Sequence, residues 1–239
     1  MSGLNILSGG AAQGLVGSLA PAFKAQTGFD IAGEFGAVGV MAEKLRNGTP
    51  ADIVILTASL LAKLAEEKLV VAASIADVGL VETALAVRTG DPQVAVRDAA
   101  DLREALLASD AIFVPDTKTS TAGIHIASVF QRIGIGDEVA ARLRVFPNGA
   151  TAMRELAASK ARRPIGCTQS TEIISTKGVT VSGSLPPGCE LATMYTAGIT
   201  VAAAHPRQAH GLIGLLAGAG QYELRKRAGF ISGRSQART

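Results

Sequence analysis

The chain has 239 residues, of which 48% are hydrophobic and 18% are charged, so it can form a large core and is too apolar for a disordered chain. Aromatic residues make up 4% and Trp is absent, which argues against the stacked rings that bind unpaired bases. The net charge of +3 depends on basic residues near the C-terminus, Arg225, Lys226, Arg227, Arg234 and Arg238. We therefore expect a solvated basic tail and no nucleic-acid partner.

No apolar run approaches the roughly 20 residues that span a bilayer, so we expect no membrane insertion. Met1 leads into a strand without the charged and apolar regions of an export signal. This predicts a cytoplasmic protein if Met1 is the native start, and a periplasmic one if a leader has been removed. Cys167 and Cys189 lack metal-ligand spacing and the histidines are scattered, so we expect no metal and no cofactor. Two buried thiols are expected, with a disulfide as the alternative in an exported protein.

Short apolar strands alternate with helical stretches along the whole chain, which is the pattern of βαβ units in an α/β protein. Strands are predicted over residues 4–7, 30–35, 51–56, 80–87, 111–115, 164–167 and 195–203. Helices are predicted after each of the first three strands, over 102–107 and 124–133, after 148–151, and as two closing helices of which the last covers 222–228.

Two of these helices carry more specific predictions. Leu15, Leu19 and Phe23 recur every four residues, so they should line one buried face of the first helix. Pro21 should kink or restart that helix, because proline removes a backbone donor. The helix after the third strand should begin near Thr57, a good N-cap residue, and continue through Leu69.

Four strand-to-helix junctions are rich in Gly, Ala, Ser and Thr, at residues 8–12, 36–39, 119–123 and 148–151. Small residues let an anion approach the first free N–H groups of a helix, where the helix dipole also favours negative charge. Open α/β sheets bind ligands at the carboxyl ends of their strands, where these junctions lie. We therefore predict an anion-binding site, with ordinary helix capping as the alternative.

Several short motifs share their order and spacing with a known family. They are the opening strand and turn, Leu19-Ala20-Pro21-Ala22-Phe23 with Thr27-Gly28, Gly48-Thr49-Pro50-Ala51-Asp52-Ile53, Thr121-Ala122-Gly123-Ile124, and Glu223-Leu224 with Ala228-Gly229-Phe230. Through them nearly the whole chain resembles the type II periplasmic solute-binding proteins, and within these the molybdate-binding branch. The resemblance implies a two-lobed α/β fold, each lobe a mostly parallel sheet flanked by helices, with the ligand in the cleft between the lobes.

The resemblance also implies where the lobes divide. Two crossing strands, near 81–86 and 195–199, would join lobe I, residues 1–81 plus 196–239, to lobe II, residues 82–195. The lobes would close around a small anionic ligand by a hinge motion. An ABC-transporter permease would be the partner, and the protein itself would be a monomer.

Relatives that hold molybdate place a serine hydroxyl in each of the first two turns, and Ala11 and either Ala37 or Val38 align with those positions here. A tyrosine of the relatives' ligand site aligns with Gln169. Because these hydroxyl donors are replaced, we expect a small carboxylate rather than an oxyanion such as molybdate. The candidate ligand-binding residues are Ser8, Gly9, Gly10, Ala11, Gln13, Ala37, Val38, Lys118, Ser120, Thr121, Ala122, Asn148, Arg154 and Gln169.

Two other functions are compatible with the same sequence. Aconitate isomerase is similar to the same branch, so the chain could be an isomerase that moves a double bond in a small polycarboxylate by a 1,3-proton shift. Such a reaction needs a base beside an acidic carbon. The candidate bases, none singled out by its spacing, are Glu34, Lys118, Glu172, Tyr195 and His125. The second alternative is a cytosolic effector-sensing module, which would need a partner because the chain lacks a DNA-binding helix-turn-helix.

Overall fold

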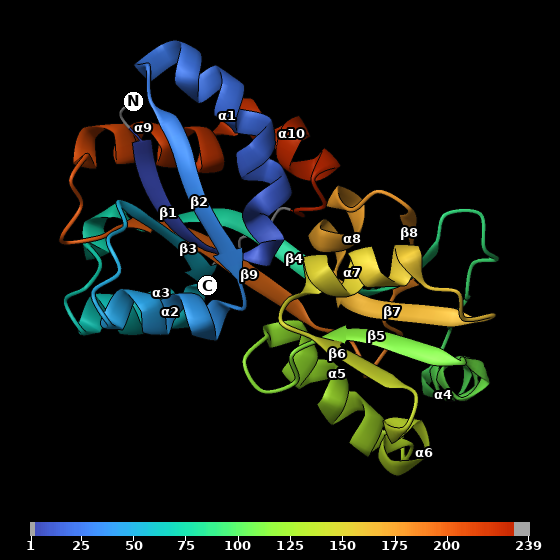
Figure 1. Ribbon diagram of the computed structural model, residues 1–239. Helices are drawn as coiled ribbons and strands as arrows, with labels where there is room; N and C mark the ends of the chain where they lie inside the picture. Colours follow the sequence, from blue (N-terminus) through green and yellow to red (C-terminus); the bar gives the residue numbers. More distant parts are fainter. Residues whose placement is uncertain (1–2, 232–239) are drawn as a thin grey trace, which may run out of the picture. The chain divides into compact units, whose positions relative to one another are not determined.

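The structure, a computed structural model, describes residues 3–231, so Arg234 and Arg238 of the expected basic tail lie outside the described residues (Figure 1). Within this range the chain has an α/β fold that divides into two compact units. Unit 1 contains residues 3–35, 41–81 and 193–231, and unit 2 contains residues 36–40 and 82–192. Two strands, β4 (Ala76–Arg88) and β9 (Ala192–Ile199), have residues in both units.

Unit 1 is built on the strand order β2-β1-β3-β9. β1 and β3 run parallel, with Leu7 opposite Val54, whereas β3 and β9 run antiparallel, with Val54 opposite Gly198. Every residue of β3 is buried, as expected for a strand covered on both faces. The other elements of this part of the chain are β1 (Gly3–Gly9), β2 (Asp30–Gly36), β3 (Ile53–Thr57), α1 (Gln13–Thr27), α2 (Val38–Arg46), α3 (Ala58–Glu66), α9 (Pro206–Ala217), α10 (Tyr222–Arg227) and the 3₁₀ turns Gly10–Ala12, Ala72–Ser74 and Ala219–Gln221.

Unit 2 has the strand order β8-β4-β7-β5-β6, in which β7, β5 and β6 run parallel and β4 runs antiparallel to both β7 and β8. Its sheet is therefore mixed rather than mostly parallel. Its elements besides β4 are α4 (Ala99–Ala108), β5 (Ala111–Pro115), α5 (Thr121–Arg132), α6 (Gly136–Ala140), β6 (Leu143–Phe146), α7 (Gly149–Ala158), β7 (Pro164–Gln169), α8 (Ser170–Ser175) and β8 (Val179–Ser184).

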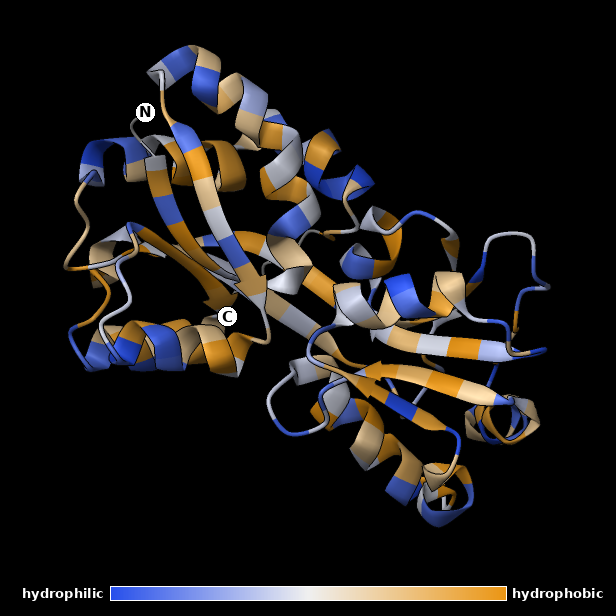
Figure 2. Cartoon of the chain, viewed as in Figure 1, coloured by the Kyte–Doolittle hydropathy of each residue, from blue (hydrophilic) through white to orange (hydrophobic). Residues whose placement is uncertain are grey.

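The sheet of unit 2 separates two hydrophobic clusters. Strand alternation directs Ile112 and Val114 of β5 toward the cluster shared with α4, α5 and α6, and Ala111 and Phe113 toward the cluster shared with α7 and α8. Figure 1 shows these two layers of helices on opposite sides of the sheet, and Figure 2 shows that β5 is hydrophobic along most of its length. Burial on both faces explains why β5 is a continuous apolar run.

Several element predictions are confirmed, and three need correction. Leu15, Leu19 and Phe23 are buried on one face of α1, and the strand over 111–115 has the predicted bounds. Pro21 does not restart α1, which runs unbroken from Gln13 to Thr27. Pro21 lies on the exposed side of this helix, where water can satisfy the carbonyl group that proline leaves without a partner.

The helix that was expected to reach Leu69 ends at Glu66, because Lys68 has a left-handed backbone with a φ of 60°. The strand that was expected over 195–203 ends at Ile199, since Ala203 donates to the Thr200 carbonyl in a turn. Sequence reasoning missed β6 and β8, which are short strands with a neighbour on one side only. Partial exposure interrupts the apolar pattern that identifies a buried strand.

Both cysteines are buried thiols in the structure. Burial raises the pKa of Cys167 to about 12, so this thiol stays protonated near neutral pH. No helix within residues 3–231 is both long enough and apolar enough to cross a membrane.

Candidate functional site

The carboxyl ends of three parallel strands form one edge of unit 2. Phe113 of β5 lies opposite Gly166 of β7, and Pro115 lies opposite Phe146 of β6, so β5, β6 and β7 end close to one another. The next helix after each strand begins at this edge: α8 directly after β7, α7 after residues 147–148, and α5 after a turn over residues 116–120. The first N–H groups of each helix have no partner within their own helix, so what satisfies them decides whether this edge can bind an anion.

The N-terminus of α7 is filled by a side chain of the protein itself. Glu172 is buried, and its carboxylate accepts hydrogen bonds from the Thr168 hydroxyl at 2.6 Å and from the backbone N–H groups of Gly149, Ala150 and Gln169. Burial raises the pKa of Glu172, and these hydrogen bonds act in the opposite direction. A Cβ atom at Gly149 would overlap both the carboxylate and the Thr168 hydroxyl, so glycine is needed for this close approach.

Two predicted ligand residues, Asn148 just before α7 and Arg154 inside it, make local hydrogen bonds to Thr151. The Asn148 side chain caps the helix by accepting from the Thr151 N–H at 2.8 Å. Arg154 is exposed, lies more than one turn inside the helix, and donates to the Thr151 hydroxyl at 2.9 Å. The junction at 148–151 was predicted as an anion site, and the structure places Glu172 on its first N–H groups.

The N-terminus of α5, by contrast, carries no internal cap. Its N-cap residue, Ser120, makes no side-chain capping bond, and the first turn contains no acidic residue. The turn before it is held by Asp116, which accepts from the N–H groups of Lys118 at 2.9 Å and Thr119 at 2.7 Å, and these bonds help lower the pKa of Asp116. A Cβ atom at Gly123 would overlap the Asp116 carbonyl oxygen, so glycine lets α5 begin against this turn.

Three buried polar side chains near this edge have no hydrogen-bond partner within the described chain. Neither amide atom of Gln169 is bonded although the residue is only 3% exposed, and the hydroxyls of Thr83 and Thr171 are buried and unbonded as well. Gln169 pairs with Thr83 across β4 and β7, and both follow the strand alternation that directs Cys167 toward the α5 side. An unsatisfied buried polar group costs about 1–3 kcal/mol, so a bound ligand that satisfies them would recover that cost.

The predicted ligand residues of unit 1 lie at the end of β1. Ser8 is fully buried, and its hydroxyl donates to the Gly9 carbonyl at 2.9 Å. Gly10 and Ala11 form the short 3₁₀ turn that leads into α1, where Gln13 is exposed. The N-cap position of α1 makes no side-chain capping bond, and its first turn has no acidic residue. This helix N-terminus therefore also remains open to an anion.

The structure thus separates the predicted residues into groups. At the edge of unit 2 it brings together Lys118, Ser120, Thr121, Ala122, Asn148 and Gln169. Ser8, Gly9, Gly10, Ala11 and Gln13 belong to unit 1, and Ala37 and Val38 are buried at the start of α2 in the segment that groups with unit 2. Sequence reasoning missed Thr83 and Thr171, because a threonine in an apolar strand or a first helical turn gives no signal of its own.

The candidate bases are mostly engaged elsewhere. Glu34 forms an ion pair with Lys44, and the His125 Nε2 atom is 2.8 Å from the Cys189 carbonyl oxygen. Tyr195 is buried in β9. Within residues 3–231 no group of three His, Cys, Asp or Glu side chains is placed to hold a metal ion.

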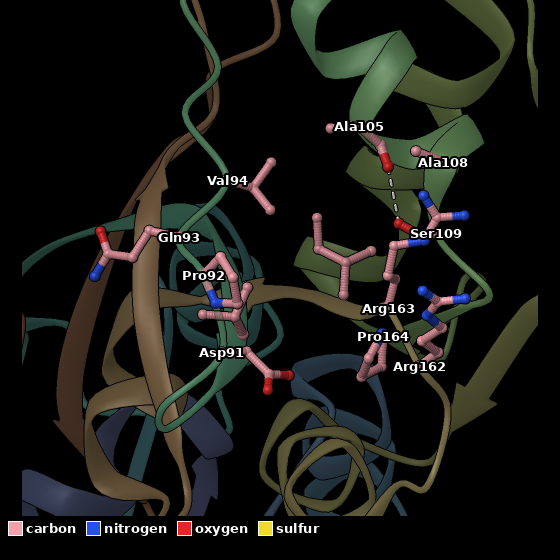
Figure 3. Close-up of a pocket in the computed structure, with 12 residues that line it drawn as sticks. Asp91, Pro92, Gln93, Val94, Ala105, Ala108, Ser109, Arg162, Arg163 and Pro164 are labelled. Atoms are coloured by element: carbon pink, nitrogen blue, oxygen red, sulfur yellow. Dashed lines mark hydrogen bonds between the residues drawn. The ribbon is translucent and has the colours of Figure 1, made fainter.

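A separate cavity of about 260 Å³ lies at the other end of β7, beside Pro164 (Figure 3). Apolar side chains form much of its wall, and Arg162 and Arg163 line one side. Its one buried hydroxyl, that of Ser109, donates to the Ala105 carbonyl at 2.8 Å, which Figure 3 shows as a dashed line. The cavity therefore lacks the unsatisfied polar groups that mark the edge with Gln169.

The profile of one protein family, bacterial extracellular solute-binding proteins, matches residues 4–231. The aconitate isomerase of a Pseudomonas species is 26% identical over 225 residues, which cover 90% of this chain and 82% of the isomerase. Among solved structures, the periplasmic molybdate-binding protein of Azotobacter vinelandii has a TM-score of 0.81 at 18% identity, covering 97% of this chain and 100% of that protein. PEB3 bound to L-phospholactate has a TM-score of 0.69 at 16% identity, covering 96% of this chain and 100% of PEB3. These structural matches establish the fold alone.

Proposed function

Because the chain belongs to the bacterial extracellular solute-binding protein family, we propose that it captures a small anion, a small carboxylate rather than an oxyanion such as molybdate. The observation that carries this proposal is the open N-terminus of α5 beside the unbonded Gln169 amide. A helix N-terminus attracts negative charge, and an amide adds directed hydrogen bonds. PEB3 binds L-phospholactate, a small anion that contains a carboxylate group, and this agrees with a carboxylate ligand.

In this proposal the two units act as the lobes of a binding protein. Lobe I would be residues 1–81 plus 196–239 and lobe II residues 82–195, and the lobes would close around the ligand by a hinge motion. The division into two compact units supports this arrangement, and β4 and β9, which have residues in both units, would contain the hinge. The family description supports a location outside the cytoplasm, and the fold shared with a periplasmic molybdate-binding protein agrees with a periplasmic one. A structure with the same fold is described as the substrate-binding domain of an ABC transporter, which supports delivery to a permease.

Thermal unfolding with added anions tests the proposal, because a ligand that binds only the folded state raises the melting temperature. The probes are molybdate, sulfate, phosphate, malate, citrate, and cis- and trans-aconitate. Stabilisation by one or more carboxylates, confirmed by titration calorimetry, is the expected result. Stabilisation by molybdate alone would contradict the carboxylate assignment, and no stabilisation by any probe would contradict anion capture.

A substitution at the open helix locates the site. In Ser120→Asp an internal carboxylate would cap α5, so we expect equal or greater stability together with a loss of anion affinity of about tenfold or more. The matched control is Gln93→Glu, which also adds one negative charge but lies beside the cavity at the far end of β7. Equal losses in both variants would mean that the anion responds to overall charge and not to this helix.

Isomerisation is the second candidate, and the similarity to aconitate isomerase favours it. The base would have to be a group at the edge that the ligand can reach, and Lys118 is the exposed candidate there. Incubation with cis-aconitate, followed by NMR for the trans isomer, tests this function. Product formation that survives Lys118→Met would exclude Lys118 as the base, and absence of product would leave a binding protein.

A further inference from the structure

The Gln169 amide restricts the kind of ligand that can bind more than a hydroxyl group would, because a hydroxyl can rotate to donate or accept. An amide always presents one hydrogen-bond acceptor, Oε1, and one donor group, Nε2, and both are buried here without a partner. Exchanging the two atoms by a flip of the amide leaves one donor and one acceptor in place. A ligand that satisfies this side chain must therefore offer an acceptor and a donor close together.

Fully ionised tetrahedral oxyanions do not meet this requirement. Sulfate and molybdate dianions present only acceptor oxygens, so one oxygen could accept from Nε2 while another would face the Oε1 atom of Gln169. Two acceptors in contact repel each other and leave the buried oxygen unsatisfied. A carboxylate with a neighbouring hydroxyl group meets the requirement, because its hydroxyl can donate to Oε1.

Of the α5 and α7 N-termini at this edge, only one is available to a negatively charged group of the ligand. The first N–H groups of α7 already hold the Glu172 carboxylate, so in unit 2 they are not available to a ligand. The α5 terminus, where Ser120 makes no cap, remains open for one carboxylate group. Thr83, directly opposite Gln169, adds a hydroxyl that can rotate to donate or accept.

From these contacts we infer that the ligand is a small hydroxycarboxylate, with one carboxylate group at the N-terminus of α5 and the hydroxyl group on Gln169. This inference rests on the proposed function and specifies the class of ligand that the same site takes. It separates hydroxycarboxylates from carboxylates of the same shape and charge that lack a hydroxyl.

The test is titration calorimetry of the full chain with matched pairs of ligands. Malate and succinate differ by one hydroxyl group, as do citrate and propane-1,2,3-tricarboxylate. We expect the hydroxyl-bearing member of at least one pair to bind about tenfold more tightly than its partner, since leaving Oε1 unsatisfied has a cost of that size. Sulfate, molybdate and both aconitates, which lack a hydroxyl group, should bind more weakly than that ligand.

Two variants test whether the Gln169 amide causes the preference for the hydroxyl-bearing ligand. Gln169→Met keeps the length of the side chain and removes both polar atoms, so the preference within the pair should shrink to about threefold or less. Arg162→Gln, beside the cavity at the far end of β7, removes a positive charge and should leave the preference unchanged. If Gln169→Met does not fold, as judged by circular dichroism, the wild-type pairs alone decide the question.

The outcomes separate this inference from the proposed function. Equal affinity for both members of each pair would overturn the hydroxycarboxylate assignment and leave anion capture standing. Tighter binding of sulfate, molybdate or an aconitate would overturn it in the same way. Binding of none of the probes would overturn both, and a hydroxyl preference that Gln169→Met leaves intact would remove Gln169 from the argument.

Discussion

Gly149→Ala is the substitution that most directly tests how the edge of unit 2 is built. A Cβ atom at this position would overlap the Glu172 carboxylate and the Thr168 hydroxyl, so the carboxylate must leave the first N–H groups of α7. The new methyl group overpacks a buried site, which costs about 1–3 kcal/mol. The displaced hydrogen bonds add about 1–3 kcal/mol more.

The two contributions together give about 2 to 6 kcal/mol, so we expect Gly149→Ala to lower the free energy of unfolding of unit 2 by roughly 4 kcal/mol. For a domain of this size, such a loss lowers the melting temperature by about 10 °C or more. Urea unfolding followed by circular dichroism gives the free energy, and differential scanning calorimetry shows whether the two units unfold separately.

The matched control is Gly211→Ala in α9, where an added Cβ atom would meet nothing within 4 Å. Gly211 is at an exposed position inside this helix, where alanine should raise stability by about 0.5–1 kcal/mol relative to glycine. A Gly149→Ala protein as stable as the wild type would refute the reasoning, because it would mean that the Glu172 carboxylate does not occupy the α7 terminus.

Three further predictions concern titrating groups. Because burial raises the pKa of Cys167 to about 12 and the Cys189 thiol is buried as well, neither should react rapidly with Ellman's reagent at about pH 8 until denaturant is added, and rapid labelling of the native protein would contradict this. Hydrogen bonds hold the pKa of Asp116 below its usual range, so the stability it contributes is present above its unfolded pKa and lost on acidification. Asp116→Ala should therefore cost about 1 kcal/mol at neutral pH and less near pH 3 in urea unfolding, and an equal cost at both pH values would argue against the bonds. Burial raises the pKa of Glu172, so its contribution is fully present below its unfolded pKa, about 4.3, and declines as pH rises through the folded pKa. The stability of the wild type relative to Glu172→Gln should accordingly fall as pH rises from 4 upward, and a difference that does not vary with pH would exclude this linkage.

Much of the fold follows from local patterns in the chain. The apolar run at 111–115 is recognisable as a buried strand because both of its faces are covered, and the spacing of Leu15, Leu19 and Phe23 identifies the buried face of α1. The short strands β6 and β8 could not be read in this way, since each has a neighbour on one side only and their apolar residues are mixed with exposed ones.

The candidate site was predictable in its location but not in its detail. Small residues at the strand-to-helix junctions indicate helix N-termini that an anion could approach, and the structure places the junctions at 119–123 and 148–151 on one edge of unit 2. By sequence the two junctions are equivalent. In the structure, Glu172 closes the second, whereas the first stays open beside Gln169 and Thr83.

The sequence by itself determined the alternation of strands and helices and the small residues where they meet, because both depend on backbone conformation and on spacing within a few residues. Only the tertiary structure decided which helix N-terminus remains open and which polar side chains stay unsatisfied. A buried polar group can form a hydrogen bond only with a group that the fold brings within about 3 Å, and here that group belongs to another segment of the chain. Tertiary packing places the Glu172 carboxylate on the first turn of α7 and leaves the Gln169 amide without a partner, and neither could be predicted from residues nearby in the sequence.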